Sequence, residues 1–474
     1  MINSVNQNYK SLAVQKFFWL FLGRVLPVLI LFVITIIYSR KLPFDDYGKF
    51  QSVWMYANIV NVFISFGLSA VILSTNLKFL FPFIKKNRKK IGVFYSLLWI
   101  SGLAAFFLFA KNFYPSLKIL LIAYIIIQNI SNIFETILIK EHGEKYSFII
   151  NFFYSLFFLG CHLYVLLTNY SLYNLIAYIC ILSVLKLIAM RIVPAKKELH
   201  ENSIDEKHFL NHWGYLGLND VLGVISKWMD KFFLLYLLTA ADFAIFFNGS
   251  FEIPLFGLLI SVAGSFLLIE ISGNLVDTDK IKRLFRESFN SLSTIVFPLF
   301  FFLFFFRNDL FSIAFKEKYN ASLPIFVISI FILPMRISNY SVILQCFSQG
   351  KKILWGSILD ICIAVILMLI LYPIMGTRGV ALAIVVSTYV QATYYLCHSA
   401  KILNTSVFQL LPLQKLAIKF LITLALYAVL FFIISGIGLK LKVIIATLFT
   451  AIIILAGILK YFKLFFKTNH VQNS

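Results

Sequence analysis

The chain has 474 residues, of which 61% are hydrophobic and only 13% charged, and its mean hydropathy is +0.90. Soluble domains carry about 25% charged residues, so this composition excludes an ordinary soluble protein and predicts an all-α, polytopic membrane protein. The formal net charge of +22 could suggest nucleic-acid binding. We expect no such partner, because most of the excess lies in loops on one side of the predicted membrane, as the positive-inside rule requires.

Apolar runs long enough to cross a hydrocarbon core of about 30 Å recur along the whole sequence. The first follows a polar segment and has no small-residue cleavage site, so we expect a retained helix rather than a signal peptide. Pro27, Pro254 and Pro334 interrupt predicted spans, which suits a rocking transporter but also occurs in static helices. In total we expect about 14 transmembrane helices, near residues 17–38, 52–75, 91–110, 119–139, 147–167, 173–193, 213–238, 243–269, 288–306, 322–347, 353–373, 379–399, 416–435 and 443–460.

Lys and Arg residues are distributed unevenly over the loops. The loop set that includes residues 78–90, 196–207 and 280–286, counted with both termini, holds about 25 of them, whereas the opposite set holds about 11. Positive loops face the cytoplasm in membrane proteins. The sequence therefore predicts that both termini are cytoplasmic, which agrees with an even number of helices.

The spans divide into two predicted lobes. We expect an N-terminal lobe at residues 1–209 with helices 1–6, a C-terminal lobe at 210–411 with helices 7–12, and two additional helices in 412–474. A short repeat supports this division, because residues 46–50 (DYGKF) and 242–246 (DFAIF) each follow the first helix of a lobe. The same offset places Arg24 opposite Asp220. Two parallel repeats with a cavity between them are a known transporter plan.

Four short motifs resemble the signatures of one known family. Residues 38–50 (YSRKLPFDDYGKF) look like its R-x-L-x-x-x-x-[YF]-G-x-[FY] pattern, and residues 227–231 (KWMDK) are similar to its D-[KR] element. Residues 318–321 (KYNA) resemble its entry to the tenth helix, and residues 376–383 (GTRGVALA) its G-x-x-G-x-A-x-A entry to the twelfth. The chain thus resembles the polysaccharide-type flippases of the multidrug/oligosaccharidyl-lipid/polysaccharide exporter superfamily.

This resemblance implies a MATE-like fold of two six-helix bundles plus two extra helices, working by alternating access. It also implies a function, the translocation of undecaprenyl-diphosphate-linked oligosaccharide repeat units across the bacterial cytoplasmic membrane. These units would belong to O-antigen or another surface polysaccharide. The implied partners are the polyprenyl-linked oligosaccharide, membrane lipid, and polysaccharide polymerase and chain-length proteins.

Basic side chains inside the predicted helices are the expected contacts for a lipid diphosphate. Such a group carries about two negative charges through a region of low dielectric constant, so cations must line its route. The candidates for a cationic cavity are Arg24, Lys227, Lys231 and Arg336. The alternative is that these charges pair internally, Arg24 with Asp220 and Lys227 with Asp230, or that Lys231 snorkels to the membrane surface.

Acidic side chains inside the helices are candidates for coupling to an H⁺ or Na⁺ gradient, and no other cofactor is expected. A counter-charge role is the alternative, favoured for Asp220 and Asp230 because they have cations nearby. Glu252 has no cation within helical reach. Glu135 and the basic residue His398 are interpreted as snorkelling residues near cytoplasmic helix ends. The coupling candidates are Glu252, Asp230, Asp220 and Asp360.

No motif for catalysis or metal binding is found. The five cysteines form no CxxC or Cys/His spacing, so neither a metal site nor a disulfide framework is expected. There is no glycine-rich phosphate loop, nucleophile elbow or HExxH sequence, and we expect the chain not to be an enzyme.

Three other functions stay open. A drug/cation antiporter of the same fold would use an acidic cavity, whereas this chain places at least as many cations as acids in its helices. A lipid II flippase would need a cationic cavity too. A membrane glycan polymerase, from a different class, would carry a large outer loop, which the spacing of the apolar runs does not provide.

Overall fold

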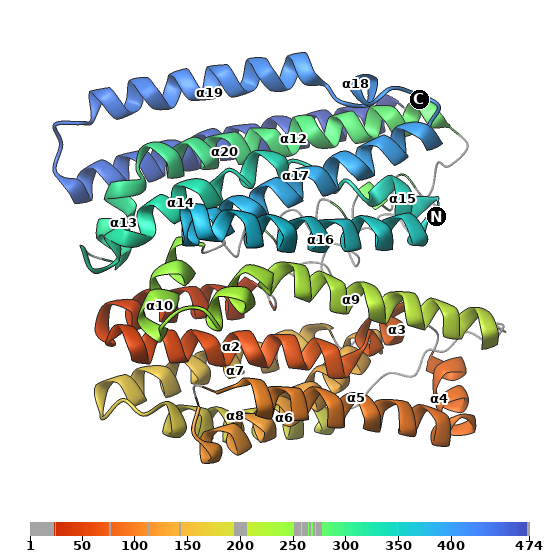
Figure 1. The fold of residues 1–474 in the computed structure, drawn as a ribbon. Helices are drawn as coiled ribbons and strands as arrows, with labels where there is room; N and C mark the ends of the chain where they lie inside the picture. Colours follow the sequence, from red (N-terminus) through yellow and green to blue (C-terminus); the bar gives the residue numbers. More distant parts are fainter. Residues whose placement is uncertain are drawn as a thin grey trace. The chain divides into compact units, whose positions relative to one another are not determined.

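The computed structural model describes residues 25–74, 77–111, 113–141, 144–193, 206–250, 277–315, 317–347 and 349–471, and the single positions 23, 257, 264, 267, 268 and 271. Every regular element in these ranges is helical (Figure 1). Ten of the helices in the described part are long and apolar enough to cross a membrane. The prediction of an all-α, polytopic membrane protein is therefore confirmed, while the number fourteen stays a prediction.

Contacts group the chain into two compact units. Unit 1 comprises Met1–Trp228 and Thr239–Ala241, and unit 2 comprises Met229–Leu238 and Asp242–Ser474. The boundary falls inside one long helix, α9 (Glu206–Leu235), so the two ends of this helix contribute to different units. The division at residues 209 and 411 expected from the sequence stays a prediction.

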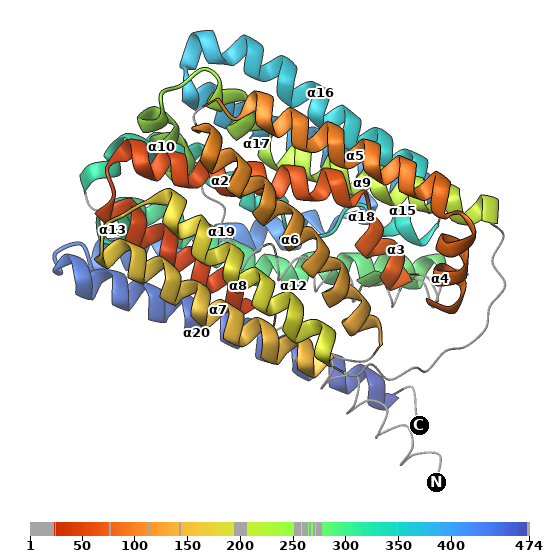
Figure 2. The ribbon, with the colours of Figure 1, turned by 90° about the horizontal axis from the view of Figure 1, so that it is seen from below.

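Unit 1 is built around α6, which packs against α2, α3, α7 and α8 (Figure 2). Residues 25–41 are also helical. Many apolar side chains of α5 are exposed, as expected for a helix that faces lipid; Ile100, for example, is 68% exposed. The helices of unit 1 are α2 (Phe44–Ser65), α3 (Leu68–Ser74), α4 (Leu77–Lys86), α5 (Arg88–Phe109), α6 (Pro115–Lys140), α7 (Glu144–Leu167) and α8 (Leu172–Ile192).

The second expected span, residues 52–75, is not one helix. Phe66 and Gly67 adopt positive φ angles of 41° and 72°, which end α2 before α3 begins. A Cβ atom on Gly67 would lie 2.6 Å from the backbone nitrogen of Gly217, so this position also requires the absence of a side chain. The Trp213 indole donates a hydrogen bond of 3.2 Å to the carbonyl of Phe66. An apolar run cannot reveal such a break, because its cause is backbone conformation.

A buried ion pair joins α6 and α8. The Nζ of Lys186 lies 3.1 Å from Oε2 of Glu135, and the two side chains are only 6% and 21% exposed. The Asn151 amide donates to Oε1 of the same carboxylate at 2.6 Å, and Lys186 lies 4.9 Å from the ring centroid of Tyr154. The interpretation of Glu135 as a snorkelling residue is thus wrong, since its carboxylate is held inside unit 1.

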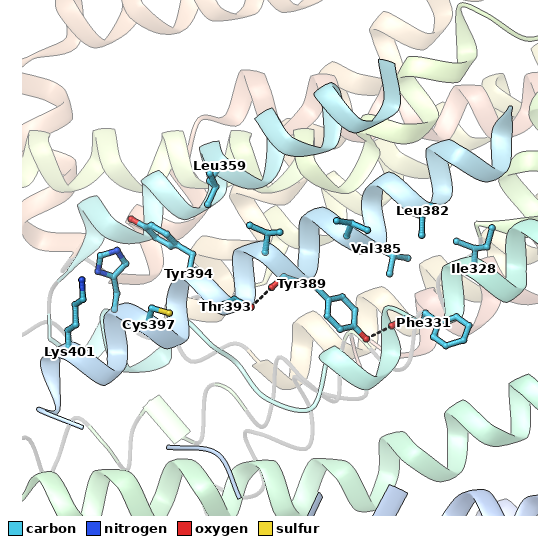
Figure 3. A pocket seen from close by; sticks show the side chains of 13 residues that line it. Ile328, Phe331, Leu359, Leu382, Val385, Tyr389, Thr393, Tyr394, Cys397 and Lys401 are labelled. Atoms are coloured by element: carbon cyan, nitrogen blue, oxygen red, sulfur yellow. Dashed lines mark hydrogen bonds between the residues drawn. The ribbon is translucent and has the colours of Figure 1, made fainter. Parts of the chain in front are cut away.

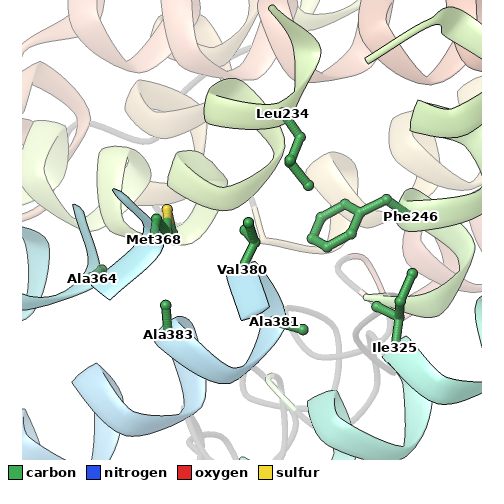
Figure 4. Close-up of a cluster of buried hydrophobic side chains, with 8 residues drawn as sticks. All are labelled: Leu234, Phe246, Ile325, Ala364, Met368, Val380, Ala381 and Ala383. Atoms are coloured by element: carbon green, nitrogen blue, oxygen red, sulfur yellow. The ribbon is translucent and has the colours of Figure 1, made fainter. Parts of the chain in front are cut away.

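Unit 2 contains the remaining helices, and part of its core is a cluster at the end of the α16–α17 pair. Figure 4 shows Leu234 and Phe246 facing Val380, with Ile325 beside them; all four are at most 2% exposed. The elements are α10 (Ala240–Gly249), α12 (Thr278–Phe305), α13 (Arg307–Phe315), η1 (Glu317–Ser322), α14 (Leu323–Ile330), η2 (Leu333–Met335), α15 (Val342–Cys346), α16 (Gly350–Met375), α17 (Thr377–Ile402), α18 (Val407–Leu410), α19 (Leu413–Ile433) and α20 (Leu439–Val471).

The motif at residues 376–383 contains the turn between α16 and α17 and the first residues of α17. Gly376 has a φ of 60°, which allows the chain to reverse immediately after α16. Gly379 lies so close to the carbonyl oxygen of Leu371 that a Cβ atom would clash with it. The two glycines therefore let the end of α16 and the first turn of α17 pack closely against each other.

The short repeat occupies equivalent positions in the two units. Tyr47 is the fourth residue of α2, and Phe243 is the fourth residue of α10. Both side chains are fully buried, as are Phe50 and Phe246, the last residues of the two motifs. The buried aromatic side chains of the repeat therefore anchor the first turns of α2 and α10 in the protein interior.

We expect Gly379→Ala to lower the stability of the folded protein by about 1–3 kcal/mol, because the added methyl group meets the Leu371 carbonyl. The melting temperature of the purified protein in detergent would measure this change. Gly350→Ala, at the start of α16, is the matched control, since nothing lies within 4 Å of a Cβ atom there. Equal melting temperatures for the two variants would contradict the close approach.

The Glu135–Lys186 pair can be tested with a double-mutant cycle. Removing one partner of a buried ion pair costs about 3–5 kcal/mol, because the other charge is left buried without compensation. We expect Glu135→Gln and Lys186→Met each to lower the melting temperature, and the double variant to lose clearly less than the sum of both. Additive losses would mean that the two side chains do not interact.

Candidate functional site

The tenth expected span, residues 322–347, is broken in the structure. It consists of α14, the short helix η2 that contains Pro334, a non-helical segment, and α15. A break inside a membrane helix leaves backbone groups without helical partners. The Tyr389 hydroxyl on α17 donates to the carbonyl of Phe331 at 2.9 Å and so satisfies one of them. The prediction that Pro334 interrupts this span is confirmed.

A large groove lies beside this break, along one face of α17 (Figure 3). Its volume is about 890 Å³, and it runs from Ile328 and Leu382 to Lys401. Leu382 and Lys401 are separated by 19 residues of one helix, which corresponds to roughly 28 Å at 1.5 Å per residue. The groove is therefore nearly as long as the hydrocarbon core is thick, at about 30 Å.

The walls of the groove are apolar, and its polar groups are concentrated at one end. Leu359 of α16 and three valines of α17 line the middle, Val385, Val386 and Val390. The hydroxyl of Thr393 donates to the Tyr389 carbonyl within the same helix, so it is not directed to a ligand. His398 and Lys401 line the groove in the last two turns of α17. The groove can thus hold a long apolar chain whose anionic end lies beside two basic side chains.

Several predicted site residues lie on α9. Lys231 is buried and forms an ion pair of 3.1 Å with its neighbour Asp230. Its Nζ also lies 5.9 Å from the ring centroid of Phe247. Lys227 is exposed and lies at 5.9 Å from the ring centroid of Trp228. The structure therefore pairs Asp230 with Lys231 and not with Lys227, the partner considered from the sequence, and the buried Lys231 does not snorkel. A contact with substrate stays a prediction for both lysines.

The other predicted site residues are separate from one another. Arg336 is half-buried and follows η2, directly at the break in the tenth span. Asp360 is 5% exposed on the buried face of α16, and Asp220 is half-buried on α9. Arg24 and Glu252 lie outside the described residues, so their roles and the predicted common cavity stay predictions. In the described ranges, no group of three or more His, Cys, Asp or Glu side chains is placed to hold a metal ion.

The groove and Lys401 were not predicted from the sequence, and His398 was interpreted only as a snorkelling residue near a helix end. A usable signal was present, because Leu382, Val386, Tyr389 and Thr393 recur at helical spacing and Lys401 follows on the same side. This stripe is hard to recognise in a helix that is apolar all round, since it differs little from a face that packs against another helix. Lys186 was missed as well, although it and Glu135 are charges inside apolar runs, the sixth and the fourth of the sequence.

The comparisons with known proteins agree with this architecture. A solved structure described as lipid II flippase MurJ, inward closed conformation, is 15% identical, covers 95% of this chain and 99% of its own, and has a TM-score of 0.68. A MATE structure in complex with MaL6 and a MOP superfamily transporter from Pyrococcus furiosus are each 15% identical with a TM-score of 0.56. Both cover 82% of this chain and 94% of their own. No curated protein matches the sequence.

Likeness at this level of identity establishes the fold, and it confirms the MATE-like architecture expected from the sequence motifs. The family is established by a separate finding. The model of the family described as polysaccharide biosynthesis protein matches residues 37–324, more than half of the chain. This multi-pass membrane protein with a MATE-like fold therefore belongs to the polysaccharide biosynthesis protein family.

Proposed function

We propose that the chain is a flippase for undecaprenyl-diphosphate-linked oligosaccharide repeat units of a surface polysaccharide such as O-antigen. It would move these units across the bacterial cytoplasmic membrane by alternating access, with both of its own termini in the cytoplasm. Family membership supports a role in polysaccharide biosynthesis. The observation that carries the choice of substrate is the groove on α17, which combines a long apolar wall with a basic end.

The groove matches the two chemically different parts of this substrate. A polyprenyl tail is flexible and apolar, and a groove roughly 28 Å long would bury much of the apolar surface of the tail. The diphosphate carries about two negative charges, which Lys401 would stabilise through charge-assisted hydrogen bonds, and a ring N–H of His398 would donate a further hydrogen bond. The positive-inside count predicts that this end of α17 lies in the cytoplasm, and we propose that the lipid-linked units are bound from that side.

Further cations would hold the diphosphate during translocation. We propose this role for Arg24, Lys227, Lys231 and Arg336. Arg336 is the most specific of them, because it lies at a discontinuous helix, and such breaks carry substrate and ion sites in other transporters. Lys231 would have to exchange its ion pair with Asp230 for a phosphate contact.

Transport against the high cost of moving a charged headgroup requires an energy source. We propose coupling to an H⁺ or Na⁺ gradient through one or more of Glu252, Asp230, Asp220 and Asp360. Asp360 is buried in α16, where a change of protonation or ion occupancy would alter the local packing. No catalytic role is proposed, and polysaccharide polymerase and chain-length proteins would act on the flipped units.

The alternatives differ in the substrate that each would bind. A drug/cation antiporter would present carboxylates to its substrate, whereas the basic end of the groove favours an anion. A lipid II flippase would use the same tail and diphosphate, so the groove does not separate it from the proposed function. Family membership in polysaccharide biosynthesis is the observation that favours the repeat unit over lipid II.

Deletion of the gene in its own organism tests the proposal. We expect loss of surface polysaccharide and accumulation of undecaprenyl-linked repeat units that stay inaccessible from outside the cell. Both can be measured, by polysaccharide staining of extracts and by mass spectrometry of the lipid fraction. Surface polymer at the level of the parent strain would refute the proposed function.

Charge reversal at the basic end of the groove tests the role of the groove. We expect Lys401→Glu to reduce export of surface polysaccharide about tenfold, because the carboxylate would repel the diphosphate. The matched control is Lys415→Glu, which reverses an exposed charge at the start of α19, outside the groove, on the same predicted side. Membrane levels of both variants would be compared by immunoblot. Equal export by the two variants would exclude Lys401 from substrate binding.

A further inference from the structure

A second cavity lies within unit 2, where the end of α19 and the start of α20 meet α13. Its volume is about 340 Å³, within the range of about 300–1,000 Å³ that small-molecule sites occupy. The first three residues of α13, Arg307, Asn308 and Asp309, line it together with Lys442 of α20. Its wall also contains three aromatic rings, those of Phe304, Phe305 and Phe431. The cavity therefore combines charged groups with apolar surfaces.

This cavity lies at the opposite end of unit 2 from Lys401. Helix α19 follows α17 and α18 and is 21 residues long, which corresponds to roughly 30 Å. Its last turn contributes Phe431 to the cavity, and α13 packs against α20 at this same end (Figure 1). The positive-inside count predicts that the Lys401 end is cytoplasmic, so the cavity is predicted to open on the outer side of the membrane.

An ion pair in the wall compensates only one of its two basic side chains. Nζ of Lys442 lies 2.9 Å from Oδ2 of Asp309, and the two side chains are only 11% and 15% exposed. Arg307 is half-buried and forms no ion pair with a carboxylate in the part of the chain that the structure describes. Its Nη1 donates to the carbonyl of Phe304, whereas its Nε and Nη2 have no hydrogen-bond partner among the described residues. The wall thus carries one uncompensated positive charge.

The charged ends of both basic side chains lie against rings that line the cavity. The guanidinium carbon of Arg307 is 5.2 Å from the ring centroid of Phe304, and Nζ of Lys442 is 4.8 Å from that of Phe431. Phe431 packs in turn against Phe305, with 5.8 Å between their ring centroids. Cation–π contacts of this kind orient a cation and leave its N–H groups able to donate elsewhere. Both positive charges are therefore located at the wall of the cavity.

Topology does not account for these two cations. Lys and Arg are depleted in the outer loops of membrane proteins, so the positive-inside rule gives no reason for a basic pair at this end. Taking a cation partly out of water costs free energy unless a partner of opposite charge compensates it. Asp309 is that partner for Lys442. An anionic ligand would be the corresponding partner for Arg307.

The charge and the surroundings of the cavity favour the phosphate of a lipid. A metal ion or a cationic drug would be repelled by the net positive charge of the wall. A guanidinium presents a planar fork of N–H groups that matches the oxygens of a phosphate. Directly after Phe431, Phe432 and Ile433 are 76% and 72% exposed. An apolar surface that suits acyl or prenyl chains therefore adjoins the charged cavity.

We propose that the cavity between α13 and α20 binds the phosphate of a lipid headgroup at the outer side of the membrane. Arg307 holds the phosphate through charge-assisted hydrogen bonds, Lys442 adds a second positive charge, and Asp309 keeps Lys442 in position. Two lipids supply this chemistry, an anionic membrane phospholipid and the diphosphate-linked lipid of the proposed function. The site goes beyond that function, because binding of a phospholipid requires no glycan substrate.

The test measures the affinity of three probes for the purified full-length protein in detergent, by microscale thermophoresis. The probes are phosphatidylglycerol, undecaprenyl diphosphate and inorganic phosphate. We expect Arg307→Gln to lower the affinity for phosphatidylglycerol about tenfold, because the charge-assisted hydrogen bonds are lost. The glutamine amide can still donate to the carbonyl of Phe304, so the end of α12 keeps its hydrogen bond.

The matched control is Lys440→Gln. Lys440 is an exposed cation two residues before Lys442 on α20, and it does not line the cavity. This variant should bind all three probes as the wild type does. Melting temperatures without added lipid verify that both variants are folded. We expect no decrease for Arg307→Gln, since the substitution removes the charge that Asp309 does not compensate.

The outcomes also identify the source of the phosphate. An unchanged affinity of Arg307→Gln for both lipids, or an equal loss in Arg307→Gln and Lys440→Gln, would overturn the proposed site. Inorganic phosphate bound as tightly as phosphatidylglycerol would overturn its assignment to a lipid. A loss confined to undecaprenyl diphosphate would assign the site to the transported lipid. The proposed function stands or falls separately, by deletion of the gene.

Discussion

The inability of the hydrocarbon interior to form hydrogen bonds is the constraint on which this structure depends. Wherever a membrane helix is broken, the freed backbone groups need partners from within the protein. The break at Phe66 in unit 1 is satisfied by the Trp213 indole, and the break at Phe331 in unit 2 by the Tyr389 hydroxyl. Large amphipathic side chains from a neighbouring helix serve in both cases, since they reach the carbonyl and still fill apolar space. At each break, a side chain of the same unit thus bonds one of the freed carbonyls.

The same constraint explains how the buried charges are arranged. Glu135 pairs with Lys186 between two helices, and Asp309 pairs with Lys442 at 2.9 Å near the ends of α13 and α20. Asp230 and Lys231 pair within one helix. Each of these buried charges is thus compensated by a partner inside the protein.

The sequence predicted those features that depend on composition, such as the membrane class, and those carried by short motifs. The DYGKF and DFAIF segments do begin equivalent helices, and the two glycines of GTRGVALA have the steric reasons expected of such residues. Contacts between residues that lie far apart in the sequence could not be predicted from it. Lys186 and Glu135 are 51 positions apart, and nothing in either apolar run indicates that they meet. The groove was not predicted because its shape depends on how α17 is rotated relative to its neighbours. Packing sets this rotation, and hydropathy does not reveal it.

The close approach at Gly379 has a mechanical consequence. The end of α16 and the first turn of α17 approach backbone to backbone, and sliding of one helix along the other would break this contact. We therefore expect α16 and α17 to move as one rigid pair. Because α17 carries most of the groove wall, a tail seated there would experience one unchanging surface while other segments shift. We expect the bending that alternating access demands to be concentrated where helices are already interrupted, as between α14 and α15.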